Sequence, residues 1–259
     1  MDLLSLVAAR YDLFFLVFLR IAGVFVGAPV IGSRYLAPQA KVALALAVAL
    51  LVLPAASEPP GGLPASLLPY LLIGLKEIAV GLVIGWAAHL VFSAVQVAGQ
   101  MLDMEMGFGM VNVIDPQFGI QLPLIGNFQY ILAIMIFLAT NGHHFLLAAL
   151  VDSARSLPVG AALLGNLPGA MVAMVAAMFV NAIKLAAPVL GTLFLTNVCL
   201  GLLARAVPQL NVFVIGLPLK LAVGAAALVV AMPLYVIMVG HLFSRLYAEL
   251  SGLLELLVP

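Results

Sequence analysis

The sequence predicts an all-α, membrane-type protein built from about six hydrophobic, partly broken helical units. Of the 259 residues, 66% are hydrophobic and 8% are charged, and the mean hydropathy is +1.29. A soluble globular domain is about half apolar and about a quarter charged, so this composition is typical of a polytopic membrane protein. Several apolar runs also reach the roughly 20 residues that a helix needs to span a bilayer.

Six apolar runs follow one another along the chain, and each is expected to be a helical unit. They lie at about 11–32, 40–56, 67–100, 122–153, 169–204 and 210–246. The second is short, whereas the last three are longer than a straight helix needs to cross a core of about 30 Å. These three carry breakers, which are Asn141-Gly142, then Pro188, then Pro218 and Pro233. Broken helices at membrane depth are tolerated where protein or a cavity covers the freed backbone groups, so we expect these units inside an assembly or along a path.

Two connections complete this organisation. The segment EPPGGLP at 58–64 is a turn-rich linker that can form neither helix nor strand. The segment VPQLN at 207–211 is a tight link between the last two runs. We therefore expect these two runs to form a helical hairpin.

Charge and cysteine content exclude several classes of function. Ten basic and ten acidic residues give a net charge of zero, so no basic stripe exists for nucleic acid. The single cysteine, Cys199, forms no intrachain disulfide and is interpreted as a small buried apolar residue. His143 and His144 are adjacent, a spacing that suits a polar helix start better than a metal site. The sequence carries no nucleophile–base pair, phosphate loop or dinucleotide fingerprint, so we expect no enzyme activity, no cofactor and no metal.

The segment 100–129 is a glycine- and methionine-rich apolar loop between two long hydrophobic runs. Its characteristic residues are Met101, Met104, Met106, Gly107, Gly109, Met110 and Gly119. Methionine repacks around irregular neighbours and glycine frees the backbone, so the composition suits closing a pore or sealing around a moving polymer. An ordinary connecting loop in an apolar groove is the alternative. Asp103, Glu105 and Asp115 have no matched acid–base partner and are interpreted as the solvated rim of this loop.

Five charged residues lie inside apolar runs and are candidates for charge pairing in an assembly. They are Arg20, Lys76, Glu77, Lys184 and Lys220. Charges at membrane depth are costly and usually face protein or water. One interpretation is an ion or substrate pathway, and the other is pairing with neighbouring subunits or snorkelling. Because acidic partners in the apolar runs are few, we expect the partners mainly in other chains.

Small-residue faces indicate close helix packing. Gly23 and Gly27 have the GxxxG spacing, and so do Gly81 and Gly85. Such faces permit close approach of two helices, although glycine is common in membrane helices in any case. We interpret both pairs as helix-packing residues.

The most specific motifs are IDPQ at 114–117, NGHH at 141–144, PQLNVF at 208–213 and GLPLK at 216–220. With the long stretches around them, they resemble the FliR family, the R component of the flagellar type III export gate. The likeness runs almost end to end and in order. The last three motifs are more similar to the flagellar branch than to the injectisome branch.

This resemblance implies partners and a place in the cell. A FliR-like chain joins FliP-like and FliQ-like subunits in one helical assembly, alongside FlhB-like and FlhA-like membrane proteins. Residues 1–165 would be a P-like helical part, and 166–259 would be a Q-like helical hairpin. The assembly would let unfolded flagellar proteins cross the bacterial inner (cell) membrane at the flagellar basal body.

The resemblance also implies that the loop after the third run is a plug inside the pore, at about 106–122. The plug or gasket residues would be Met106, Gly107, Phe108, Gly109, Met110, Val111, Ile114, Asp115, Pro116, Phe118 and Gly119. An alternative function is a small-solute secondary transporter with broken helices. That class predicts inverted repeats and convergent polar groups, and the sequence carries neither. A passive scaffold without pore contact is a third possibility that the sequence leaves open.

Overall fold

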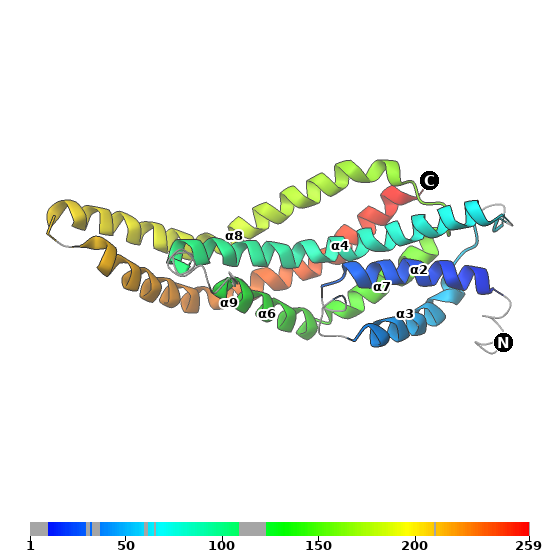
Figure 1. Ribbon diagram of the computed structural model, residues 1–259, viewed down its shortest axis with the longest axis horizontal. Helices are drawn as coiled ribbons and strands as arrows, with labels where there is room; N and C mark the ends of the chain where they lie inside the picture. The colour runs from blue at the N-terminus through cyan, green and yellow to red at the C-terminus, as the bar shows by residue number, and fades with distance from the viewer. Residues whose placement is uncertain are drawn as a thin grey trace. The chain divides into compact units, whose positions relative to one another are not determined.

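The structure is a computed structural model that describes residues 10–29, 32, 37–59, 62–64, 66–108, 123–209 and 211–258. Within these residues it contains α-helices, short 3-10 helices and no strand, which confirms the all-α prediction. The elements are α2 (Tyr11–Gly27), α3 (Pro38–Val52), η1 (Leu53–Ala55), α4 (Leu67–Met106), α6 (Leu124–Ala139), α7 (Gly142–Ser156), η4 (Leu164–Asn166), α8 (Leu167–Ala206) and α9 (Val212–Leu257) (Figure 1).

The helices have the length and composition of membrane spans. In the described part of the chain, four are long and apolar enough to cross a membrane, and α6 with α7 would make a fifth, broken span. α8 has 40 residues and α9 has 46. At about 1.5 Å per residue they extend about 60 Å and about 69 Å, roughly twice a bilayer core. Membrane-type character is therefore confirmed.

The prediction that prolines break the last two runs is wrong. Pro188 lies inside α8, Pro218 and Pro233 lie inside α9, and both helices continue through them. A proline removes one backbone hydrogen bond and crowds one carbonyl group, but the turns on either side keep their bonds. Ending a helix in apolar surroundings would expose several unpaired backbone groups, so continuing through one defect costs less.

The predicted break at Asn141-Gly142 is confirmed. α6 ends at Ala139 and α7 begins at Gly142, so the fourth apolar run is two helices. Asn141 between them has φ 57°, the left-handed conformation. Asparagine tolerates this conformation better than most residues that carry a Cβ. His143 and His144 occupy the first turn of α7, with ring centroids 4.2 Å apart.

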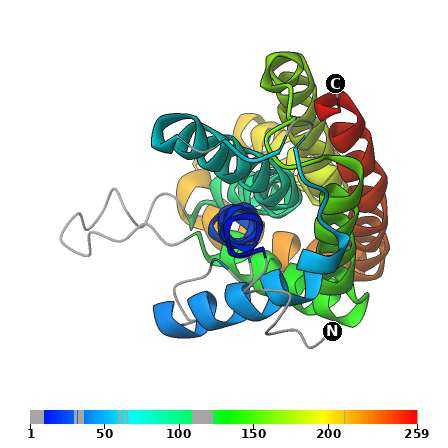
Figure 2. The same ribbon diagram turned by 90° about the vertical axis from the view of Figure 1, so that its right-hand side faces the viewer.

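Close contacts divide the chain into two compact units, and the first comprises Met1–Val91, Asn141–Val175 and Phe243–Pro259. In this unit α2 lies between α3 and the first part of α4 (Figures 1 and 2). The described residues of the predicted linker, 58–59 and 62–64, have no regular secondary structure, as expected.

The two glycine pairs lie where α2 packs against α4. A Cβ on Gly23 would lie 2.6 Å from the carbonyl oxygen of Ile78, and one on Gly85 would lie 2.6 Å from a carbonyl oxygen of α2. Gly27 and Gly81 face the opposite backbone just as closely. Side chains do not fit at such distances, so this backbone-to-backbone approach requires glycine.

The second unit comprises Phe92–Thr140 and Ala176–Leu242. Within it, α8 and α9 form a hairpin, and the end of α8 and the start of α9 lie at the left of Figure 1. The end of α4 packs on α6 through aromatic rings, because Phe92 meets Phe137 edge-on at 5.5 Å between ring centroids. This unit carries the stem of the loop that the sequence singles out.

Candidate functional site

The candidate site is the stem of the apolar loop, which consists of the end of α4, the start of α6 and the part of α9 that contacts them. The bounds that the sequence predicted for this loop are too wide. The segment 100–129 is not all loop, because α4 continues through Met106 and α6 already begins at Leu124. The positions Ala98, Leu102 and Met106 recur four residues apart and are all buried, so the helical pattern extends past residue 100. Of the predicted plug residues, Met106 ends α4, and Gly107 and Phe108 follow it. The others lie outside the described residues, and they are Gly109, Met110, Val111, Ile114, Asp115, Pro116, Phe118 and Gly119.

The end of α4 is held against α9. Met106 is 2% exposed, and a Cβ on Gly224 would lie 2.8 Å from its Cγ atom and 3.0 Å from its sulfur. The absence of a side chain at Gly224 therefore makes a shallow socket for Met106. Gly107 then turns the chain with φ +90°, and Leu217 of α9 lies directly over it. A residue with a side chain would be strained there, so glycine fixes where the helix stops.

The start of α6 is held against α4 by one carboxylate. Asp103 Oδ1 accepts a hydrogen bond from the backbone N–H of Ile125 at 2.9 Å, and Oδ2 accepts one from Gly126 at 3.0 Å. Asp103 is 5% exposed. These are the second and third residues of α6, whose own N-cap residue, Pro123, offers no side-chain acceptor. Asp103 thus caps α6 from another helix, where its charge also suits the positive end of the helix dipole.

Glycine lets the two helices approach at this point. A Cβ on Gly99 would collide with the Cα atom of Gly126. A Cβ on Gly126 would meet Gln100 N and Gln96 O at 3.5 Å. The carboxylate of Asp103 can reach the backbone of α6 because the two helices pack this closely.

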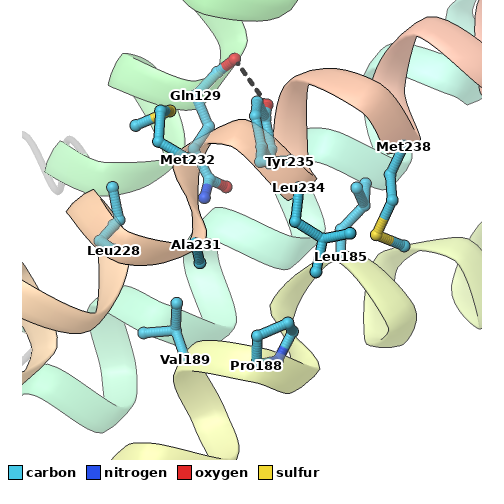
Figure 3. Close-up of a pocket in the computed structure, with 10 residues that line it drawn as sticks. All are labelled: Gln129, Leu185, Pro188, Val189, Leu228, Ala231, Met232, Leu234, Tyr235 and Met238. Carbon is cyan, nitrogen blue, oxygen red and sulfur yellow. Dashed lines mark hydrogen bonds between the residues drawn. The ribbon is translucent and has the colours of Figure 1, made fainter.

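A turn further along, α6 is held by α9. The hydroxyl of Tyr235 donates a hydrogen bond to the carbonyl oxygen of Gln129 at 3.0 Å (Figure 3). Both residues border a small cavity of about 10 Å³, whose other walls are Leu185, Pro188, Val189, Leu228, Ala231, Met232, Leu234 and Met238. The side-chain amide of Gln129 points into it, and its Oε1 atom accepts no hydrogen bond from the described residues. The cavity has room for little more than one water molecule, so it is no solute-binding site.

The buried charges form a separate cluster in the first unit. Arg20 Nε donates to Glu77 Oε2 at 2.5 Å, and both side chains are fully buried. Arg20 also donates to the carbonyl oxygens of Ser153 at 2.8 Å and Leu157 at 3.2 Å. Glu77 Oε1 accepts the backbone N–H of Gly160 at 2.8 Å. The ion pair thus joins α2, α4 and the chain that leaves α7, and no polar atom of it needs water.

The expectation that these charges find their partners in other chains is wrong for Arg20 and Glu77, which pair within this chain. Sequence alone could not decide this, because the two residues are 57 positions apart. Lys76 is exposed on α4, with Nζ 3.5 Å from the carbonyl oxygen of Gly160. Lys184 is exposed on α8 and Lys220 is half-buried on α9, and neither forms an ion pair among the described residues.

Sequence reasoning missed two contributors to the loop stem. Asp103 was assigned to a solvated rim, yet it is buried, because α4 continues under it and α6 covers it. Tyr235 received no role. For Asp103 the sequence offered only an acidic residue within an apolar helical pattern, because the helix start that it caps lies 22 residues further along the chain.

Comparisons with known proteins identify the family of this chain. The family described as "Bacterial export proteins, family 1" matches residues 11–246. The flagellar biosynthetic protein FliR of Bacillus subtilis is 39% identical over 250 residues, covering 95% of this chain and 96% of that protein. FliR of Escherichia coli is 32% identical over 247 residues, covering 94% of this chain and 93% of that protein. FliR of Caulobacter vibrioides is 27% identical over 218 residues, 84% of this chain and 87% of that protein.

The family match spans the loop, its stem on α4, α6 and α9, and the buried ion pair together. Identity also exceeds 30% across nearly the whole of two of these relatives. The chain therefore belongs to the FliR family of bacterial export proteins, which are components of the flagellar export apparatus.

Proposed function

We propose that this chain is a structural, pore-forming subunit of the flagellar type III export gate. It assembles with FliP-like and FliQ-like subunits, next to FlhB-like and FlhA-like proteins, in the bacterial inner membrane at the flagellar basal body. The gate passes unfolded flagellar proteins. The observation that carries this proposal is the family match over residues 11–246, which includes the whole loop and its stem.

Charges on the long apolar helices support assembly with partner subunits. Lys184 is exposed on α8 in the single chain, and Lys220 is half-buried on α9. A lysine facing lipid at membrane depth is costly, so these side chains need protein or water around them. Apolar residues are also exposed along both helices, among them Phe194 at 65% and Val230 at 81%. In this proposal the hairpin within 166–259 is the Q-like part and 1–165 is the P-like part, and partner subunits cover these faces.

The loop 106–122 is the seal of the closed pore in this proposal. Its two ends are held independently, by Met106 in its socket on α9 and by Asp103 at the start of α6. A loop with a fixed stem and a glycine- and methionine-rich span can change shape without unfolding the helices beside it. That combination suits a seal that opens around polypeptides of different shapes and closes again.

Shortening the loop tests the seal. Residues 107–119 are replaced by a short Gly/Ser linker, and the variant is produced with its partner subunits. We expect assembly at the wild-type level, together with a membrane that leaks ions, measured as ion flux into vesicles that contain the complex. The matched control replaces 60–64, in the linker after η1, by glycine and serine and should not leak. A shortened variant that assembles, stays tight and still supports motility would reject the seal.

A further inference from the structure

We propose that Asp103 is a positioning residue that clasps the two ends of the loop and so sets where the seal lies. This inference rests on the proposed sealing function of the loop. The clasp consists of the Asp103 carboxylate on α4 and the backbone N–H groups of Ile125 and Gly126 on α6. It joins α4 and α6 at the base of the loop, through described residues.

Nothing else in the described residues caps the first turn of α6. Pro123, the residue before the helix, forms no side-chain cap hydrogen bond. Its carbonyl accepts the N–H of Asn127 at 2.9 Å, which is an ordinary helical bond. The first free N–H groups of a helix need an outside acceptor, and here both acceptor atoms belong to one side chain. Loss of that side chain would leave the buried N–H of Gly126 and the part-buried N–H of Ile125 unpaired, so the turn would open toward water.

The rest of the stem would stay in place when the clasp is lost. Tyr235 still binds the carbonyl of Gln129 one turn further along, and Met106 still occupies its socket at Gly224. Opening would therefore be confined to the first turn of α6, from Leu124 onward. The point where the loop joins α6 would then move along the helix by about one turn, which is up to about 5 Å, the pitch of the helix. A seal whose end shifts by that distance no longer covers the same opening.

The two hydrogen bonds also determine which side chain at position 103 can form the clasp. Two separate N–H donors need two acceptor oxygens, and a carboxylate offers both. An asparagine at this position offers one oxygen, and its NH2 group would face a second N–H donor. Asp103→Asn should therefore disrupt the clasp almost as much as Asp103→Ala, although it preserves size and polarity.

The test compares Asp103→Ala and Asp103→Asn with Glu105→Ala in the complex assembled with partner subunits. Glu105 is two residues away but exposed, with its carboxylate 3.2 Å from the side-chain amide nitrogen of Asn197, so it is the matched control. Amide hydrogen exchange is followed in the peptide that covers 123–129, and ion flux is measured in vesicles. Loss of charge-assisted bonds of ~1.5–3 kcal/mol corresponds to about a ten- to hundredfold rise in opening at about 1.4 kcal/mol per tenfold. We expect exchange to rise by that factor and ions to leak in both Asp103 variants, with neither change in the control.

A covalent link supplies the readout that a purely structural role would not produce. Gln100 and Asn127 are exposed, and the backbone nitrogen of Gln100 lies 3.5 Å from a Cβ placed on Gly126. The substitutions Gln100→Cys and Asn127→Cys are made in a Cys199→Ser background, and the two introduced thiols are joined by a short bis-maleimide. In Asp103→Ala this link should restore a tight membrane, because it holds α6 on α4 in place of the carboxylate.

Three other outcomes would contradict the proposal that Asp103 clasps the loop. Unchanged exchange in Asp103→Ala means that the carboxylate does not hold the turn. Faster exchange with a tight membrane means that the clasp does not position the seal. Failure of the cross-linked Asp103→Ala chain to assemble means that Asp103 serves folding in another way. The loop-shortened variant, measured in parallel, tells whether the seal itself still stands in these cases.

Discussion

The buried ion pair between Arg20 and Glu77 makes the sharpest prediction about stability. Arg20→Leu and Glu77→Gln are made singly and together. Each single change leaves an uncompensated polar or charged group in a site where both side chains are fully buried. Breaking such a pair by removing one partner costs about 3–5 kcal/mol. Total stabilities of folded domains are about 5–15 kcal/mol, so either change alone should strongly reduce the yield of assembled complex.

The double variant separates the free energy of the ion pair itself from that of the groups around it. It removes both charges and leaves the carbonyls of Ser153 and Leu157 without their donor, whereas the amide oxygen introduced by Glu77→Gln can still accept the N–H of Gly160. Each such group costs about 1–3 kcal/mol if it stays dry. We therefore expect the double variant to be destabilised about as much as one single variant. The coupling free energy of the cycle would then be about 3–5 kcal/mol.

The assay is pulse proteolysis of the complex across a denaturant series in mixed micelles, with a tag on this chain to follow its folded fraction. The control cycle uses Arg10 and Glu58, whose atoms lie 3.6 Å apart with side chains 45% and 49% exposed. An exposed pair of this kind contributes about 0–1 kcal/mol. A coupling free energy for Arg20 and Glu77 no larger than that of the control pair would refute the assignment of a buried, dry ion pair. Cargo selectivity should not change in variants that still assemble.

The remaining predictions address packing, the helix break and assembly. Gly23→Ala should separate α2 from α4 and lower the melting temperature of the complex. The control Gly191→Ala, at a position with open space around it, should be neutral or stabilise by up to about 1 kcal/mol. Equal melting temperatures for the two variants would contradict the close packing of α2 and α4. Asn141→Val should destabilise by about 1–2 kcal/mol in the pulse-proteolysis assay because of the positive φ, and Asn141→Gly should not, so similar losses for both would exclude backbone strain as the cause. Expressed alone, the chain should aggregate in detergent and be rescued by FliP-like and FliQ-like subunits; a monodisperse, heat-stable monomer on gel filtration would count against the assembly.

Local rules in the sequence were sufficient for the features that depend on neighbours along the chain. The apolar runs predicted helices of membrane type because hydrophobic length and composition are local properties. The helix break at Asn141-Gly142 was correct because a left-handed residue ends a helix wherever it lies. The prediction that the prolines break the last two runs was wrong because a proline removes only one hydrogen bond. Whether the helix continues depends on what surrounds it. In α8 and α9 the apolar surroundings favoured continuity.

The loop stem shows which features local sequence reveals and which depend on how the helices dock. Its composition was evident in the sequence, but its start was placed too early because the methionines were counted as loop rather than as the last turns of α4. Asp103 was assigned to a solvated surface because no local pattern reveals that α6, more than 20 residues later, returns to cover it. Only docked helices bring its carboxylate to those two N–H groups.

The sequence by itself determined that the protein is all-helical, of membrane type, with a glycine- and methionine-rich apolar loop and a C-terminal hairpin. Those properties follow from composition, periodicity and turn chemistry, which act over a few residues. The tertiary structure decided that Arg20 pairs with Glu77, that the glycines of α2 and α4 meet, and that Asp103 caps α6. These depend on which helix faces dock, and docking is set by the summed packing of many distant side chains rather than by any short stretch of the chain.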